Sequence, residues 1–106
     1  MNVDIAYKDG QATLAMVVRD YQDKLLYVTS ALDRCTSPHM AEILALEWAS
    51  KYAEQCLWNK VIWSSDAKEV VKEVKSEDEP TAWNMFYALR SIKKRFSSFD
   101  WNLEWN

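Results

Sequence analysis

The amino-acid sequence predicts a single α/β domain built on a mixed sheet. The chain has 106 residues, which suits one domain, and its single glycine and two prolines argue against disorder and a loop-rich all-β fold. Three alternating segments precede one long helical segment, and a short strand follows that helix. A strand-helix-strand order makes a right-handed crossover between parallel strands. We therefore expect parallel and antiparallel pairs in one sheet.

The longest periodic segment, residues 37–57, predicts the central helix. Ser37 is expected as its N-cap and Pro38 at its first helical position. Glu42 lies one turn before the first member of the apolar stripe, so we place it at the inward end of that stripe. A carboxylate that faces a core needs a partner, a proton or a metal. The apolar stripe consists of Leu46, Ala49, Ala53 and Leu57.

Alternation of apolar and polar residues predicts five strands. The dipeptide Asp9-Gly10 is a hairpin turn signal between the first two. Asp4 lies in the middle of the first strand, and Asp66 directly follows the fourth. The expected strands are 2–7, 12–19, 25–32, 60–65 and 99–106, and two further helices are expected at 67–75 and 81–96.

Three acidic residues form the candidate site: Asp4, Glu42 and Asp66. If the first and fourth strands are parallel neighbours, Asp4 and Asp66 lie close together, and the central helix brings Glu42 within reach. Clustered carboxylates repel one another unless cations neutralise them, and Mg²⁺ or Mn²⁺ prefers such oxygen ligands. Two ions about 4 Å apart activate a water and stabilise the leaving oxygen of a phosphodiester. We therefore expect the three acids to be metal ligands and catalytic residues.

Each acid also has a structural interpretation that the sequence leaves open. Asp66 followed by Glu69 matches a capping box at a helix start. Asp4 would need no ligand if it lay near a strand end and faced solvent. Glu42 is close enough to the start of its helix to complement the helix dipole.

Four runs of this sequence resemble the ribonuclease H-like domain, and in particular the reverse-transcriptase-like subgroup of plant proteins and retroelements. They are VDIAY, AMVVRDYQDKLL, AEILALEWA and SSDAKEVVKEV. The resemblance spans residues 1–106 and implies a five-stranded mixed sheet of order 3-2-1-4-5 with helices on both faces. It also implies endonucleolytic cleavage of the RNA strand of RNA/DNA hybrids with two Mg²⁺ or Mn²⁺ ions. The first three metal-binding carboxylates of the family fall on Asp4, Glu42 and Asp66, with Asp4 bridging the ions.

Two departures from the family pattern affect the functional interpretation. The fourth carboxylate of the family belongs to an N-x-x-AD segment after the fifth strand, whereas this sequence stops at Asn106. We expect a domain truncated at its C-terminus, without the closing helix. The glycines usual after the first aspartate and in the second strand are also replaced, with Ile5, Ala6 and Ala15 among their counterparts. A fragment of an active nuclease and an inactive module that binds nucleic acid or protein both stay open.

Charge and cysteine usage limit the expected partners and location. The net charge of −3 excludes a general polyanion binder, so nucleic-acid contacts must be local. Arg90 and residues 93–95 form a basic cluster that suits phosphates, although cations also complement the end of any helix. Trp105 at the C-terminal edge suits a protein partner. Free Cys35 and Cys56, with no leader or membrane span, indicate an intracellular protein, cytoplasmic or nuclear.

Overall fold

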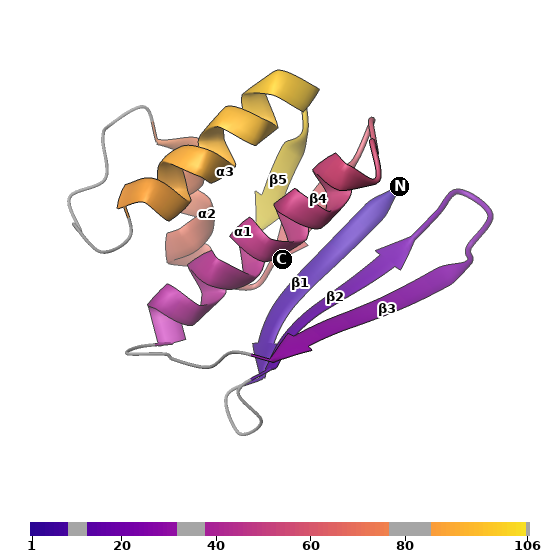
Figure 1. Ribbon diagram of the computed structural model, residues 1–106, viewed down its shortest axis with the longest axis horizontal. Helices are drawn as coiled ribbons and strands as arrows, with labels where there is room; N and C mark the ends of the chain where they lie inside the picture. Colours follow the sequence, from indigo (N-terminus) through magenta and orange to yellow (C-terminus); the bar gives the residue numbers. More distant parts are fainter. Residues whose placement is uncertain (9–12, 32–37, 77–85, 106) are drawn as a thin grey trace.

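The computed structural model describes residues 1–8, 13–31, 38–76 and 86–105 (Figure 1). Its five strands form one sheet in the order β3-β2-β1-β4-β5, as the sequence predicts. The turn at Asp9-Gly10, the N-cap at Ser37 and the start of the third expected helix lie outside the described residues. The elements are β1 (Asn2–Lys8), β2 (Thr13–Arg19), β3 (Leu25–Ala31), α1 (Pro38–Gln55), β4 (Ile62–Ser65), α2 (Lys68–Lys75), α3 (Phe86–Phe99) and β5 (Asn102–Trp105).

Strand β1 is the centre of the sheet and carries both kinds of pairing. It runs antiparallel to β2, with Asp4 opposite Val17, and parallel to β4, with Asp4 opposite Ser64. Helix α1 connects β3 to β4, and β4 pairs with β1 in the parallel sense. The expected crossover between parallel strands is therefore present. Strand β5 then pairs with β4 in the parallel sense.

The core lies between the sheet and the helices. Helix α1 packs on β1 and β2, α2 packs on β5, and the three helices contact one another, so they form one layer (Figure 1). The resemblance implied helices on both faces, whereas the described helices cover one face only. The reason is the alternation along the strands, because the strand side chains that belong to the core cluster share that face. They are Val3, Ile5, Leu14, Met16, Val18, Trp63 and Leu103.

An aromatic cluster fills the core beneath α3. The ring of Trp63 lies 5.5 Å from that of Phe96 and 5.1 Å from that of Trp101, measured between centroids. Trp101 donates its indole N–H to the carbonyl of Trp58 at 3.2 Å, which satisfies the one polar group of its ring. Trp63 and Trp101 are therefore core residues.

Two helices end in left-handed residues that are not glycine. At the end of α1, Leu57 has φ 57°, and the amide of Trp58 donates to the carbonyl of Ala53 at 3.0 Å. At the end of α3, Asp100 has φ 55°, and the amide of Trp101 donates to the carbonyl of Phe96 at 3.0 Å. Both are Schellman-type caps.

These caps correct two expectations. Helix α3 continues to Phe99, beyond the expected end at Phe96, and β5 begins only at Asn102. Leu57 was expected on the apolar stripe of the central helix, but its cap conformation turns it outward and leaves 77% of it exposed. Apolar periodicity predicted neither helix end correctly, because a residue in the left-handed conformation ends a helix without a change in hydropathy.

Replacement of Leu57 by glycine should stabilise the protein. A side chain in the left-handed region costs about 1–2 kcal/mol, while glycine loses about 0.5–1 kcal/mol of extra entropy on folding. We expect Leu57→Gly to raise the free energy of unfolding by about 0.5–1 kcal/mol in urea titrations. Leu57→Ala keeps the Cβ atom and should show no such gain. Equal stabilities of the two variants would contradict the cap assignment.

Candidate functional site

Asp4 lies on the face of the sheet that points away from α1. Its neighbours Val3 and Ile5 are buried in the core, and side chains alternate along a strand, so Asp4 is exposed on the opposite face. It faces solvent, as one interpretation of the sequence allowed. It nevertheless lies inside the central strand and not at a strand end, between Val17 of β2 and Ser64 of β4.

An open hollow of about 470 Å³ surrounds Asp4 on this face. Arg19 and Glu104 line it with opposite charges, and the sequence analysis missed both as neighbours of Asp4. Register would have identified them, because Arg19 pairs with Asn2 and Glu104 pairs with Ser64. The cross-strand row through Asp4 is therefore polar on three strands, with Asp4, Ser64 and Glu104, and Arg19 lies in the next row.

Asp66 follows the end of β4, on the strand next to Asp4. Asp4 is in register with Ser64, so Asp66 lies two residues beyond the position opposite Asp4 and just outside the strand that pairs with β1. Asp66 is exposed and is not the helix cap that a capping box requires. The N-cap of α2 is Ala67, and no side chain makes a cap hydrogen bond there. The amide of Ala67 instead donates to the hydroxyl of buried Ser65 at 3.1 Å.

Glu42 lies on α1, on the other side of β1 from Asp4. Its side chain is half-buried, and its Oε2 atom is buried. The residues that flank it, Ala41 and Ile43, are fully buried. The expectation that Glu42 lies at the inward side of the helix is therefore consistent with its burial. Ile5 of β1, which the resemblance sets among the counterparts of the family glycines, is 4% exposed and lies in the core.

The described residues do not gather the three acids into one set of ligands. No group of three histidine, cysteine, aspartate or glutamate side chains in this part of the chain is placed to hold a metal ion. The donor chemistry suits Mg²⁺ or Mn²⁺, because all three candidates are carboxylates. The geometry meets the needs of a metal ion only in part. Asp4 lies on β1 and Asp66 follows its neighbour β4, whereas α1 carries Glu42 on the other side of β1.

His39 and Lys93 each have a partner within the protein. The Nε2 atom of His39 lies 2.8 Å from Oε1 of Glu73, which links the start of α1 to α2. Lys93 donates to the carbonyl of Ser76 at 2.8 Å, at the end of α2. Cys56 is a free, exposed thiol. Among the helices that the structure describes, none has the length and apolar character needed to cross a membrane.

Comparisons with known proteins agree with the fold. A family model described as reverse transcriptase-like matches residues 2–105. The structure of RNase H1 from the halophilic archaeon Halobacterium salinarum superposes with a TM-score of 0.80 and 16% identity, covering 99% of this chain and 82% of that one. The N-terminal RNase H domain of a Mycobacterium tuberculosis protein, solved as a fusion with maltose-binding protein, superposes with a TM-score of 0.74 and 18% sequence identity. This match covers 100% of this chain and 87% of that one. No curated protein matches this chain.

The sheet order, the single helical layer and these superpositions define a ribonuclease H-like fold. Within that class, the chain belongs to the reverse transcriptase-like family, whose model covers nearly its whole length. The resemblance stated from the sequence is therefore confirmed.

The role of Asp66 in the fold is testable by substitution. Since Asp66 makes no cap hydrogen bond, Asp66→Ala should change the free energy of unfolding by less than about 0.5 kcal/mol. Ser65→Ala should cost about 1 kcal/mol or more, because it removes a buried hydrogen bond to the backbone of Ala67. Denaturant titration of both variants measures this. A loss of about 1 kcal/mol on Asp66→Ala would restore the capping interpretation.

Proposed function

We propose that this chain is a ribonuclease H-type phosphodiesterase that cleaves the RNA strand of RNA/DNA hybrids. The observation that carries the proposal is the position of Asp4 on β1 and of Asp66 directly after β4, its parallel neighbour in a ribonuclease H-like sheet. Family membership supports it, because the motifs that match the family contain these two acids and Glu42. An intracellular location, with reduced cysteines, is part of the same proposal.

Asp4, Glu42 and Asp66 would hold two Mg²⁺ or Mn²⁺ ions. The ions supply an activated water and neutralise the negative charge that develops on the phosphodiester. The chain contributes β1, which carries Asp4, the end of β4, which Asp66 follows, and the helix that carries Glu42. In this proposal Glu42 also lies near the 2′-hydroxyl, the group that distinguishes RNA from DNA.

A second candidate function is a non-catalytic module that binds nucleic acid or protein. The observation that favours it is the placement of Glu42 on the core side of β1, where Ile5 of that strand is buried, while Asp4 faces the other way. Trp105 at the end of β5 is 55% exposed, with the ammonium of Lys68 5.1 Å from its ring centroid, and it would belong to a protein-binding edge. This module would retain the fold and lack cleavage.

Cleavage of a labelled RNA/DNA hybrid decides between the two functions. With Mg²⁺ or Mn²⁺ present, we expect the chain to cut the RNA strand, and Asp4→Asn to slow cleavage more than about 100-fold because a direct metal ligand is lost. Asp100→Asn is the matched control, since asparagine also tolerates the left-handed conformation of this exposed residue. Absence of cleavage by the unaltered chain would overturn the catalytic proposal and leave the binding module.

Thermal unfolding tests the metal site without any substrate. An ion that binds only the folded chain stabilises it by about 2.7 kcal/mol at a hundredfold excess over its dissociation constant. We expect Mg²⁺ or Mn²⁺ to raise the melting temperature, and Asp4→Asn to remove that rise. An equal rise in the variant would show that the ions bind elsewhere.

A further inference from the structure

Helix α3 carries a concentration of positive charge in an acidic protein. Its sequence, FYALRSIKKRFSSF, contains four cations and no acid. The whole chain has a net charge of −3, so the residues outside α3 sum to −7. A basic segment on an acidic domain marks a local surface for an anionic partner.

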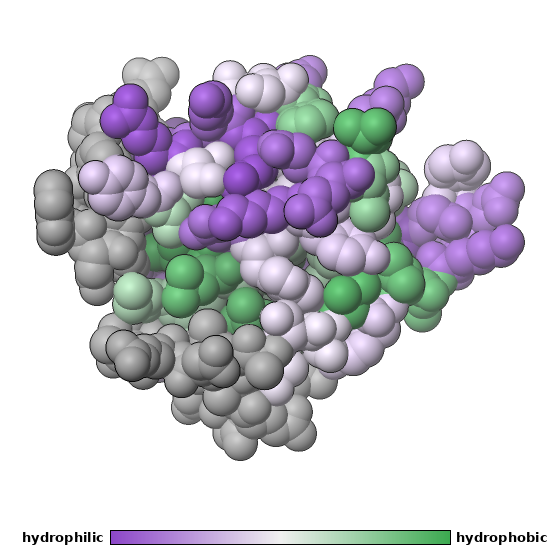
Figure 2. Space-filling view, viewed as in Figure 1, coloured by the Kyte–Doolittle hydropathy of each residue, from purple (hydrophilic) through white to green (hydrophobic). Residues whose placement is uncertain are grey.

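The outer side of α3 borders a groove of about 410 Å³ next to the C-terminal half of α1. Figure 2 shows hydrophilic residues gathered along this side of the molecule, over α3 and the adjoining part of α1. The groove is lined by three cations, Arg90, Lys94 and Arg95, and by one acid, Glu54. Its other lining residues all carry a hydroxyl group: Tyr87, Ser91 and Ser98.

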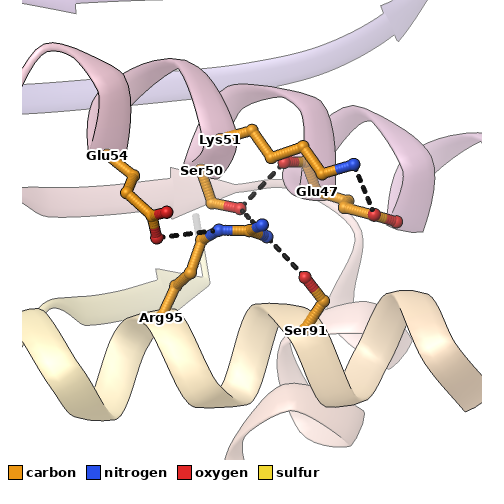
Figure 3. Close-up of polar contacts among 6 residues, drawn as sticks. All are labelled: Glu47, Ser50, Lys51, Glu54, Ser91 and Arg95. Carbon is orange, nitrogen blue, oxygen red and sulfur yellow. Dashed lines mark hydrogen bonds and ion pairs between the residues drawn. The ribbon is translucent and has the colours of Figure 1, made fainter.

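Arg95 is held in place at the base of this groove (Figure 3). Its Nε atom donates to Oε2 of Glu54 at 3.1 Å, and its Nη1 atom donates to the hydroxyl of Ser91 at 2.6 Å. A longer contact of 3.4 Å reaches the hydroxyl of Ser50. The side chain of Arg95 is 16% exposed, whereas that of Glu54 is 47% exposed. The single acid of the groove is therefore neutralised from within the protein.

The remaining cations of α3 divide into two groups. Lys93 is directed to the carbonyl of Ser76 at the end of α2 and does not line the groove. Arg90 and Lys94 are exposed, lie one turn apart on α3 and both line the groove. The basic cluster that the sequence suggested for phosphates is therefore reduced to these two exposed side chains beside the fixed guanidinium of Arg95.

We propose that the groove between α1 and α3 binds phosphate groups of a nucleic-acid backbone. Arg90 and Lys94 supply the charge, and the hydroxyls of Tyr87 and Ser98 supply uncharged donors. The contact is independent of base sequence, because the groove presents cations and hydroxyls rather than a pattern for base edges. The choice of nucleic acid as the ligand rests on the proposed function.

The groove is separate from the carboxylates. Glu54 lies twelve residues after Glu42 on the same helix, and a rise of 1.5 Å per residue places their backbones about 18 Å apart. The groove therefore serves to hold a substrate and takes no part in the reaction itself. A variant can therefore lose binding at the groove and keep the carboxylates, or lose cleavage and keep the groove.

The test is equilibrium binding of a fluorescein-labelled RNA/DNA hybrid, measured by anisotropy in EDTA at several salt concentrations. Chelation of metal keeps the hybrid intact, so the result does not depend on cleavage. The variant is Arg90→Gln/Lys94→Gln, which keeps good helix-forming residues on the surface of α3. The control is Lys72→Gln/Lys75→Gln, which removes the same charge from exposed positions of α2. Circular dichroism checks that both variants keep the fold.

We expect the α3 variant to bind the hybrid at least about tenfold more weakly at low salt, and the slope of log K against log salt to fall by about two, one for each lost phosphate contact. The α2 control should bind as the unaltered chain does. Equal binding by the α3 variant and the unaltered chain would overturn the proposal. It would also be overturned if the α2 control weakened binding equally, since the effect would then report net charge. The loss of cleavage on Asp4→Asn is measured apart, so failure of one proposal leaves the other identifiable.

Discussion

The alternation of side chains along β1 is the constraint on which the rest of the structure depends. β1 is the only described strand that pairs in both senses, with β2 on one side and β4 on the other. Val3 and Ile5 face α1 and anchor the core, and this orientation directs Asp4 to the opposite face. A shift of one residue in register would bury Asp4 and expose both apolar side chains, so the core fixes the position of the acid.

The same constraint explains the arrangement of the candidate site. Parallel pairing of β1 with β4 brings Asp4 and Asp66 to neighbouring strands, whereas α1 can approach β1 only from the face that Val3 and Ile5 occupy. Helix α1 therefore carries Glu42 on the core side of β1, whereas the side chain of Asp4 lies on the other face of the sheet. The three candidates are all carboxylates, but the described elements place them on two sides of β1.

The order of strands and helices could be predicted because it depends on patterns that extend over whole segments. The helix ends and the cap of α2 could not, because each depends on the conformation or hydrogen bond of a single residue. Periodicity identified the strands, the central helix and the crossover, and the resemblance added the sheet order. The ends of α1 and α3 were missed because Leu57 and Asp100 adopt left-handed conformations that glycine usually marks. The capping box at Asp66 failed because the sequence pattern does not reveal that the hydroxyl of Ser65 binds the Ala67 amide. The neighbours of Asp4 depend on register, which hydropathy alone does not give.

Helix α1 carries Glu42 near its start and Glu54, which lines the groove, near its end. Every fourth residue along its inner side is a fully buried alanine: Ala41, Ala45, Ala49 and Ala53. Small side chains let the helix lie close to its neighbours, and close packing resists bending and sliding. Glu42 and Glu54 are therefore held at a fixed separation along one rigid element. A nucleic acid held at the groove would therefore keep a fixed distance from Glu42 along this helix, whereas Asp4 lies on the opposite face of the sheet.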